Sequence, residues 1–388
     1  MKRIVLLGST GSIGRSTLEV VRSLGARVEI VGLSANTRIG DLVRQVEAHR
    51  PLAVAVGDPS MADDVRSAAG GRRVEVFSGP EGLLELAGLA EADLVVNALV
   101  GAAGILPTLA AIEAGKDVAI ANKESLVAAG AVIVGRARAS GVNLIPVDSE
   151  HSAIYQCIKG ESRDAIKRII LTASGGALAD MPADEIENVQ ASQALRHPTW
   201  SMGRKVTIDS ATLLNKGFEV IEAHWLFGIE AGHIEVAIER RSIVHSLVEF
   251  VDGSVMALLS PPDMRLPIQY ALTFPDRVES RLPGLDLVSA GGIEFGKPDL
   301  DRFPCLGLAY EVAAMGGTAG AVLSAADEVA VDAYLEGRIS FGEIHSVLRD
   351  VLSIHEVKDA DNLDSVLAAD AWAREQTAGI VEEISGRV

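Results

Sequence analysis

Cysteine and aromatic residues are scarce in this chain of 388 residues. There are two cysteines, Cys157 and Cys305, and Phe, Trp and Tyr together make up 4% of the sequence. Two cysteines so far apart cannot form a disulfide framework or a CxxC metal site. We therefore expect a reduced, cytoplasmic protein.

Positive charge is also in short supply. Lys and Arg total 35 against 53 Asp and Glu, which gives a formal net charge of -18. Such a field repels the phosphates of nucleic acid and the headgroups of anionic lipid. We expect neither a nucleic acid nor a membrane among the partners of this protein.

Uninterrupted apolar runs are short. The longest apolar segment, residues 94–112, contains polar and helix-breaking residues such as Asn97, Gly101 and Pro107, which are typical of a strand, a loop and a helix rather than a membrane span. The N-terminal MKRIVLLG has an apolar run broken at Gly8, so it lacks the apolar core of a signal peptide. We expect it to form a first strand.

Hydrophobic residues make up 48% of the chain, and its length predicts two or three domains at roughly 150 residues each. Residues 1–149 alternate short β-branched runs with helical patterns, which predicts an α/β, Rossmann-like dinucleotide-binding domain. Residues 150–273 mix strands and helices and include a hairpin turn at Asp252-Gly253, as in an α+β catalytic domain. Residues 274–299, rich in Pro and Gly, predict a connecting segment, and residues 300–388 a C-terminal helical bundle with a capping box at Ser340 and Glu343.

A glycine-rich turn, GSTGSIG at residues 8–14, follows the first predicted strand and opens a helix. This arrangement is typical of a loop that binds a pyrophosphate, although a merely structural turn has the same pattern. The second strand ends at SANTR, residues 34–38, without the acidic residue that reads an NAD ribose. Arg38 favours NADP, unless it is a solvated loop cation.

Two carboxylates, Asp148 and Glu150, follow an apolar run in PVDSEH. In extended backbone they would point the same way, and side-by-side carboxylates need a cation between them or a shared proton. The alternatives are a metal site, an acid/base pair or a solvated loop end. Lys123, in ANKES at the end of another predicted strand, is a ligand-binding candidate or a surface residue of a helix cap.

A third carboxylate lies in DSATLLNKGFEVIEAHWLFG, residues 209–228. We expect one helix here, capped by Asp209 or Ser210 and ended by Gly228, with Asn215, Glu219 and Glu222 on one stripe. That stripe is either functional or an ordinary exposed face. All-oxygen ligation by Asp148, Glu150 and Glu219 would suit Mg²⁺ or Mn²⁺.

Two polar loops complete the candidates. TASGG, residues 172–176, offers the Ser174 hydroxyl and free amides to a phosphate, or is a simple glycine turn. HPTWSMGRK, residues 197–205, is either a lid or a buried Trp-Met cluster.

Taken together, these stretches resemble the 1-deoxy-D-xylulose 5-phosphate reductoisomerase family, in order along nearly the whole chain. Further matching stretches are VGAAGILPT at 100–108, PPDMRLPI at 261–268 and FPCLGLAYE at 303–311. The resemblance implies NADPH, a divalent cation (Mn²⁺, Mg²⁺ or Co²⁺), a small phosphorylated sugar as substrate and a homodimer. It implies rearrangement of 1-deoxy-D-xylulose 5-phosphate by retro-aldol and aldol steps, then reduction to 2-C-methyl-D-erythritol 4-phosphate for isoprenoid precursors.

The resemblance also implies site residues. The metal ligands are Asp148, Glu150 and Glu219, and the catalytic residues are these three with Lys123 and His197. The substrate contacts are Lys123, Ser149, Glu150, Ser174, His197, Trp200, Met202, Ser210, Asn215, Lys216 and Glu219. The cofactor contacts are Gly8, Thr10, Gly11, Ser12, Ile13, Ala35, Asn36, Arg38, Asn122, Glu124 and Gly203.

The sequence departs from the family pattern at two points. Ala177-Leu178 stands where Pro-Phe is common after TASGG, and Thr37 stands where relatives have a lysine. Rival interpretations are an aspartate-semialdehyde or homoserine dehydrogenase and a nucleotide-sensing scaffold. The first of these needs a nucleophilic cysteine, whereas both cysteines here lie in apolar, helix-like surroundings. A scaffold would be expected to have lost Asp148, Glu150, Glu219 or Lys216.

Overall fold

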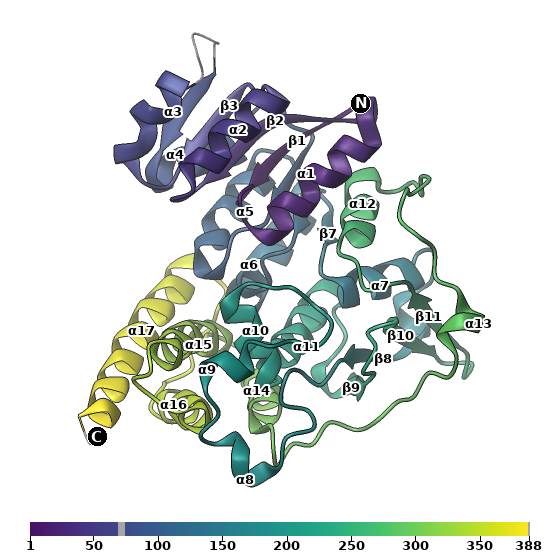
Figure 1. Cartoon of the computed structure of the whole chain (residues 1–388), viewed down its shortest axis with the longest axis vertical. Coiled ribbons are helices and arrows are strands. Elements are labelled where there is room, and N and C mark those ends of the chain that lie inside the picture. Colours follow the sequence, from purple (N-terminus) through teal and green to yellow (C-terminus); the bar gives the residue numbers. More distant parts are fainter. Residues whose placement is uncertain (69–73, 387–388) are drawn as a thin grey trace. The chain divides into compact units, whose positions relative to one another are not determined.

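A computed structural model describes residues 1–68 and 74–386, which form two compact units (Figure 1). Unit 1 comprises residues 1–125, 133–152 and 263–282, and unit 2 comprises residues 126–132, 153–262 and 283–388. The chain therefore returns to unit 1 after residue 262. The predicted boundaries at residues 149, 273 and 299 stay predictions.

A seven-stranded parallel sheet forms the centre of unit 1, in the order β4-β3-β2-β1-β5-β6-β7. Its strands are β1 (Lys2–Leu7), β2 (Val28–Ala35), β3 (Ala53–Val56), β4 (Glu75–Ser78), β5 (Leu94–Asn97), β6 (Asp117–Ile120) and β7 (Leu144–Pro146). Strands β3 and β5 are buried along their whole length, as expected for a parallel sheet covered on both faces. The strand order reverses between β1 and β5, where open α/β sheets bind ligands at the carboxyl edge.

Helices connect these strands, as the alternating sequence pattern predicts. They are α1 (Ser12–Leu24), α2 (Ile39–His49), α3 (Ala62–Ala68), α4 (Gly79–Ala87), α5 (Ile105–Glu113) and α6 (Lys123–Ser140). Helix α12 (Arg265–Thr273) comes from much later in the chain and packs on α1. The Rossmann-like fold predicted for the N-terminal region is confirmed.

Unit 2 contains a four-stranded mixed sheet, in the order β11-β10-β8-β9. Its strands are β8 (Ile166–Ala173), β9 (Ile234–Ile238), β10 (Val244–Phe250) and β11 (Val255–Leu259). The predicted turn at Asp252-Gly253 joins β10 and β11, which pair antiparallel, and Gly253 has a φ of 85°. Ile154, Ile169, Val220 and Val248 belong to the core beside this sheet, and helix α11 (Leu214–Phe227) contacts β8 and β9.

The helical region of unit 2 surrounds α15. Its long helices are α14 (Pro304–Met315), α15 (Ala319–Leu335), α16 (Phe341–Ser353) and α17 (Leu363–Ser385), and the last three lie side by side in Figure 1. The Ser340–Glu343 capping box is confirmed at the start of α16. The other helices of unit 2 are α8 (Ala183–Ile186), α9 (Ala191–Ala194), α10 (Arg204–Ala211) and α13 (Leu287–Ala290), while α7 (Ser149–Cys157) starts in unit 1 and ends in unit 2. Within residues 1–68 and 74–386, no helix has the length and apolar character to cross a membrane.

Candidate active site

The glycine-rich turn between β1 and α1 admits no larger side chain at two of its glycines. Gly8 has a φ of 77°, and a Cβ there would lie 2.4 Å from the carbonyl oxygen of Ala98. A Cβ on Gly14 would lie 2.3 Å from the carbonyl oxygen of Gly8. The turn can therefore bring its backbone amides close to a ligand at the start of α1, as a pyrophosphate needs.

Arg38 lies beside this turn. Strand β2 ends at Ala35, and the Arg38 guanidinium reaches back to donate from Nη1 to the carbonyl oxygen of Thr10, at 3.3 Å. The side chain of Asn36 lies against Gly57, where a Cβ would come within 2.2 Å of its Oδ1. The structure therefore places Arg38 at the predicted pyrophosphate turn, in unit 1.

Asn122 joins the loop after β5 to the start of α6. Its Oδ1 caps α6 by accepting from the Ser125 amide, and its Nδ2 donates to the Gly101 carbonyl at 3.0 Å and to Glu124 Oε2 at 2.9 Å. The cap itself is confirmed, and it holds the backbone next to Lys123, but the alternative that Lys123 is a surface residue is wrong, because Lys123 is 8% exposed.

A buried polar pair behind this cap was missed by the sequence reasoning. Asn97 Nδ2 donates to Thr108 Oγ1 at 2.7 Å and to the Gly104 carbonyl at 3.0 Å. Both side chains are fully buried. The signal was present, because a buried strand ends in Asn and an apolar helix carries Thr. The pair fixes one end of the loop at residues 101–104, and Asn122 donates to the Gly101 carbonyl in the same loop.

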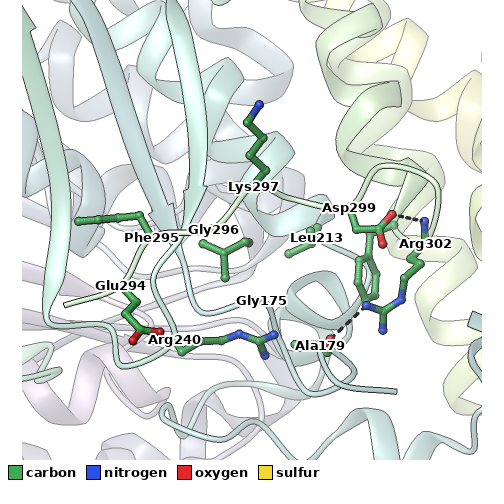
Figure 2. Close-up of a pocket in the computed structure, with 12 residues that line it drawn as sticks. Gly175, Ala179, Leu213, Arg240, Glu294, Phe295, Gly296, Lys297, Asp299 and Arg302 are labelled. Atoms are coloured by element: carbon green, nitrogen blue, oxygen red, sulfur yellow. Dashed lines mark hydrogen bonds between the residues drawn. The ribbon is translucent and has the colours of Figure 1, made fainter. Parts of the chain in front are cut away.

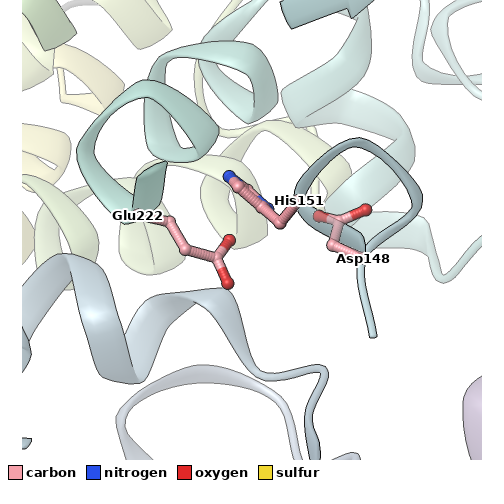
Figure 3. Close-up of side chains that lie close together, drawn as sticks. All are labelled: Asp148, His151 and Glu222. Atoms are coloured by element: carbon pink, nitrogen blue, oxygen red, sulfur yellow. The ribbon is translucent and has the colours of Figure 1, made fainter. Parts of the chain in front are cut away.

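Lys123 and Asp148 form an ion pair in unit 1. Lys123 Nζ lies 2.7 Å from Asp148 Oδ2, and both side chains are largely buried. Asp148 precedes α7, whose first residue, Ser149, donates from Oγ to Glu150 Oε2 at 2.6 Å. Figure 3 shows Asp148 with His151 of the same turn.

The extended backbone expected at Asp148 and Glu150 is wrong, although carboxylate oxygens of the two residues do lie within 4.8 Å of one another. Strand β7 ends at Pro146, and Glu150 already belongs to the first turn of α7. The side chains are placed by a strand-to-helix turn at the carboxyl edge of the sheet. The first turn of a helix also favours carboxylates.

Glu219 is the buried acid of unit 2. Asn215 Nδ2 donates to its Oε1 at 2.6 Å, and Lys216 Nζ pairs with its Oε2. Glu219 is 1% exposed and Lys216 is 4% exposed. Glu222, one turn further along α11, is also buried. The stripe is therefore not an ordinary exposed face.

The single helix predicted from Asp209 onward is wrong, because two helices occupy this stretch. Helix α10 ends at Ala211 and α11 starts at Leu214, and Leu213 between them has a φ of 60°. The predicted end of α11 is confirmed, since Gly228 closes it in the left-handed conformation. The break turns Ser210 and Asn215 onto two separate helices.

Ser174 and His197 meet in unit 2. Ser174 Oγ lies 3.0 Å from His197 Nε2 and accepts from the Gly176 amide at 3.2 Å. His197 Nδ1 accepts from the Thr199 amide at 3.1 Å and the Trp200 amide at 2.9 Å, so the ring proton is on Nε2 and points at Ser174.

The turn after β8 packs on α10. Gly176 has a φ of 73°, and a Cβ there would lie 2.3 Å from the Ser210 carbonyl oxygen. The structure therefore brings three of the predicted substrate contacts, Ser174, His197 and Ser210, into one part of unit 2. Trp200 and Met202 are half-buried, in contrast to a buried Trp-Met cluster.

A cavity of about 260 Å³ adjoins this turn (Figure 2). Arg302, in its wall, donates to the carbonyl oxygens of Leu178 and Ala179, at 3.2 Å each. These bonds hold the stretch after TASGG, where the sequence has Ala177-Leu178 instead of Pro-Phe.

We expect the hydrogen bonds of His197 to the Thr199 and Trp200 amides to stabilise the protein less at acidic pH. Burial lowers the pKa of His197. Because the folded pKa lies below the unfolded value of about 6.5, stabilisation by the neutral ring is complete above that pH and is lost as the pH falls through the folded pKa. Protonated Nδ1 cannot accept from Thr199 and Trp200. The measurement is the difference in unfolding free energy between the wild type and His197→Phe. This difference should be about 1 kcal/mol larger at pH 7.5 than at pH 5. A difference that does not change with pH would contradict the prediction.

Each unit, taken by itself, contributes hard oxygen donors. Asp148 and Glu150 belong to unit 1 and Glu219 to unit 2, and each of Asp148 and Glu219 is paired with a lysine. Hard oxygen donors of this kind suit Mg²⁺ or Mn²⁺. Both cysteines are buried, and burial raises the pKa of the Cys305 thiol, which argues against a cysteine nucleophile.

Comparison with known proteins decides the family. Three family models match the chain: 1-deoxy-D-xylulose 5-phosphate reductoisomerase over residues 4–130, its C-terminal domain over 144–227, and the DXP reductoisomerase C-terminal domain over 259–376. A curated 1-deoxy-D-xylulose 5-phosphate reductoisomerase from a Synechococcus species is 50% identical over 390 residues, covering 100% of both chains. The chain belongs to the 1-deoxy-D-xylulose 5-phosphate reductoisomerase family.

Other members of the reductoisomerase family are also similar along nearly the whole chain. A relative from Pelotomaculum thermopropionicum is 50% identical and covers 99% of this chain and 100% of its own. A crystal structure of DOX-P reductoisomerase in complex with NADPH, fosmidomycin and magnesium matches with a TM-score of 0.95 at 38% identity, over 98% of both chains. The Zymomonas mobilis enzyme in complex with NADPH matches with a TM-score of 0.92 at 40% identity, over 98% of this chain and 99% of that one. The predicted family and fold class are confirmed.

Proposed function

We propose that this chain catalyses the NADPH- and divalent-metal-dependent conversion of 1-deoxy-D-xylulose 5-phosphate to 2-C-methyl-D-erythritol 4-phosphate in isoprenoid precursor biosynthesis. Full-length similarity to reductoisomerases supports this function. The observation that carries it is the pairing of buried lysines with acids, Lys123 with Asp148 and Lys216 with Glu219. Oxidation of NADPH that requires both this substrate and a divalent cation is the test.

We propose Asp148, Glu150 and Glu219 as the metal ligands, for Mn²⁺, Mg²⁺ or Co²⁺. The hydrogen bonds of Ser149 to Glu150 and of Asn215 to Glu219 orient two of these carboxylates. A divalent cation, when bound, polarises the substrate carbonyl and stabilises negative charge on the reacting oxygens. Lys123 and Ser149 would donate hydrogen bonds to the substrate hydroxyls.

The substrate phosphate would be bound in unit 2. Ser174, Ser210, Asn215 and Lys216 supply hydroxyl, amide and ammonium donors, and the Nε2–H of His197 adds a fifth. Trp200 and Met202 would cover the bound substrate and exclude water from it. In a chain with a net charge of -18, this positive potential is strictly local.

NADPH supplies the hydride. We propose that Gly8, Thr10, Gly11, Ser12 and Ile13 bind its pyrophosphate at the start of α1. The remaining cofactor contacts are Ala35, Asn36, Arg38, Asn122, Glu124 and Gly203. The Arg38 contact with the Thr10 carbonyl supports a 2′-phosphate site next to this turn.

Arg38→Ala is expected to raise the KM for NADPH about tenfold and to leave the KM for the sugar phosphate unchanged, because one charge-assisted hydrogen bond to the 2′-phosphate is lost. Steady-state kinetics with each substrate varied in turn measures both constants. Arg44→Ala is the matched control, since Arg44 lies on the following helix α2 and pairs with Asp41 at the surface. Equal effects on both KM values would remove Arg38 from the cofactor site.

We infer a homodimer and a cytoplasmic location. Edge strand β11 of the sheet in unit 2 presents Val255, 50% exposed, and Met256, 42% exposed. An apolar edge strand is normally covered in the functional protein. The two free cysteines support a reducing compartment.

A further inference from the structure

Three charged side chains of unit 2 form a buried cluster, the α10 anchor, which consists of Lys205, Asp209 and Asp327. Lys205 Nζ lies 2.8 Å from Asp209 Oδ2 and 2.5 Å from Asp327 Oδ2. The lysine side chain is 13% exposed and each aspartate side chain 1%. Lys205 and Asp209 are one turn apart on α10, whereas Asp327 lies on α15.

The α10 anchor links three helices. Besides its two carboxylate partners, Lys205 Nζ lies 4.8 Å from the centre of the Phe218 ring on α11. Charges buried at this depth are poorly tolerated unless their partners stay in place, so such a cluster favours one arrangement of the elements that carry it. The anchor therefore restrains α10 against both α11 and α15.

Helix α10 continues directly into the proposed phosphate site. Ser210 follows Asp209, and its carbonyl oxygen packs so closely on Gly176 that no Cβ fits there. Gly176 in turn donates its amide to Ser174 Oγ. At the other end, α10 starts after Gly203, the last residue of the segment that contains Trp200 and Met202. A shift of α10 would move Ser210, the Ser174–Gly176 turn and the end of that segment together.

We propose that Asp327 is a positioning residue for substrate binding: through Lys205 it holds α10 where Ser210 and the Ser174–Gly176 turn receive the substrate phosphate. The proposal deepens the proposed function and rests on it for the identity of the substrate. In this proposal α15 contributes to phosphate binding indirectly, through the contact of Asp327 with Lys205, and Asp327 itself does not contact the substrate.

Asp327→Asn is the decisive variant, because it preserves the side-chain shape and the Lys205–Asp209 pair and removes only the negative charge of Asp327. The KM for 1-deoxy-D-xylulose 5-phosphate should rise about fivefold to tenfold, while kcat and the KM for NADPH change by less than about twofold. A merely structural role would lower the melting temperature without this selective effect on one KM.

Limited trypsin digestion gives a second readout that needs no activity. Arg204 is exposed at the start of α10, and cleavage after it requires local opening of the helix. Mass spectrometry should show cleavage about fivefold to tenfold faster in Asp327→Asn than in the wild type. Glu328→Gln is the matched control: it breaks the neighbouring ion pair of α15, 2.8 Å from Arg374 on α17, and should change neither readout.

The outcomes separate the two proposals. Unchanged KM and unchanged cleavage in Asp327→Asn, with an active wild type, would overturn the positioning role. An inactive wild type would overturn the proposed function, and the cleavage rates would still decide whether Asp327 restrains α10. Should Asp327→Asn fail to fold, Lys205→Gln tests the same link from α10 and should raise the same KM; an unchanged KM would overturn the role.

Discussion

Glu219→Gln is expected to lower kcat by roughly 1000-fold, because it removes one negative charge from the proposed metal ligands while it preserves the size of the side chain. The hydrogen bond from Asn215 cannot compensate, since the amide that replaces the carboxylate is a far weaker ligand for a hard cation. Turnover of NADPH at increasing Mn²⁺ measures the loss. Part of it should be recovered at high Mn²⁺, as for a weakened metal site.

A binding measurement separates metal affinity from chemistry. Titration calorimetry with Mn²⁺ should show weaker binding to Glu219→Gln than to the wild type. Glu235→Gln is the control, because Glu235 lies on β9 in the same unit and pairs with Arg168 at the surface. If Glu219→Gln bound Mn²⁺ as tightly as the wild type and retained full turnover, Glu219 would not be a metal ligand.

Lys216→Met is expected to lower kcat/KM for the sugar phosphate about 100-fold, with most of the loss in KM. Lys216 is buried beside Glu219, and its ammonium is the one full charge among the four side chains of Ser174, Ser210, Asn215 and Lys216 proposed for the phosphate. Inorganic phosphate should inhibit the wild type competitively and the variant much less. Steady-state kinetics at varied substrate, with and without inorganic phosphate, measures both effects.

The affinity for Mn²⁺ distinguishes Lys216→Met from Glu219→Gln. Lys216→Met removes a positive charge next to Glu219, so the net charge around the proposed metal ligands becomes more negative. The affinity for Mn²⁺ should therefore not fall. Lys167→Met is the control, since the side chain of Lys167 is 58% exposed and pairs with Glu249, away from the proposed phosphate contacts. Loss of Mn²⁺ affinity together with an unchanged KM would assign Lys216 to the metal site instead of the phosphate.

Local patterns predicted much of the fold and the types of residue in the site. The glycines at 8, 11 and 14 predicted the turn between β1 and α1. At Gly11 and Gly14 the steric demand comes from neighbours in sequence, whereas at Gly8 it comes from the distant Ala98 carbonyl. The end of α11 at Gly228 and the capping box of α16 followed from equally local signals.

What sequence could not predict depends on contacts distant in the chain. The break at Leu213 requires a left-handed backbone in a residue that rarely adopts it, so local preference argued for one continuous helix. The start of α7 at Ser149 was hidden for a similar reason, since PVDSEH also suits a strand end. The α10 anchor needs Asp327 and Lys205 to meet from separate helices, and no spacing rule along the chain relates them.

The most direct test of the proposed reaction follows NADPH absorbance with purified protein and 1-deoxy-D-xylulose 5-phosphate, with Mn²⁺ present or removed by a chelator. We expect NADPH oxidation that depends on the sugar phosphate, stops when the metal is removed and returns when Mn²⁺ is restored. No turnover with Mn²⁺, Mg²⁺ or Co²⁺, in a protein that demonstrably binds NADPH, would contradict the proposed reaction and favour a nucleotide-binding scaffold.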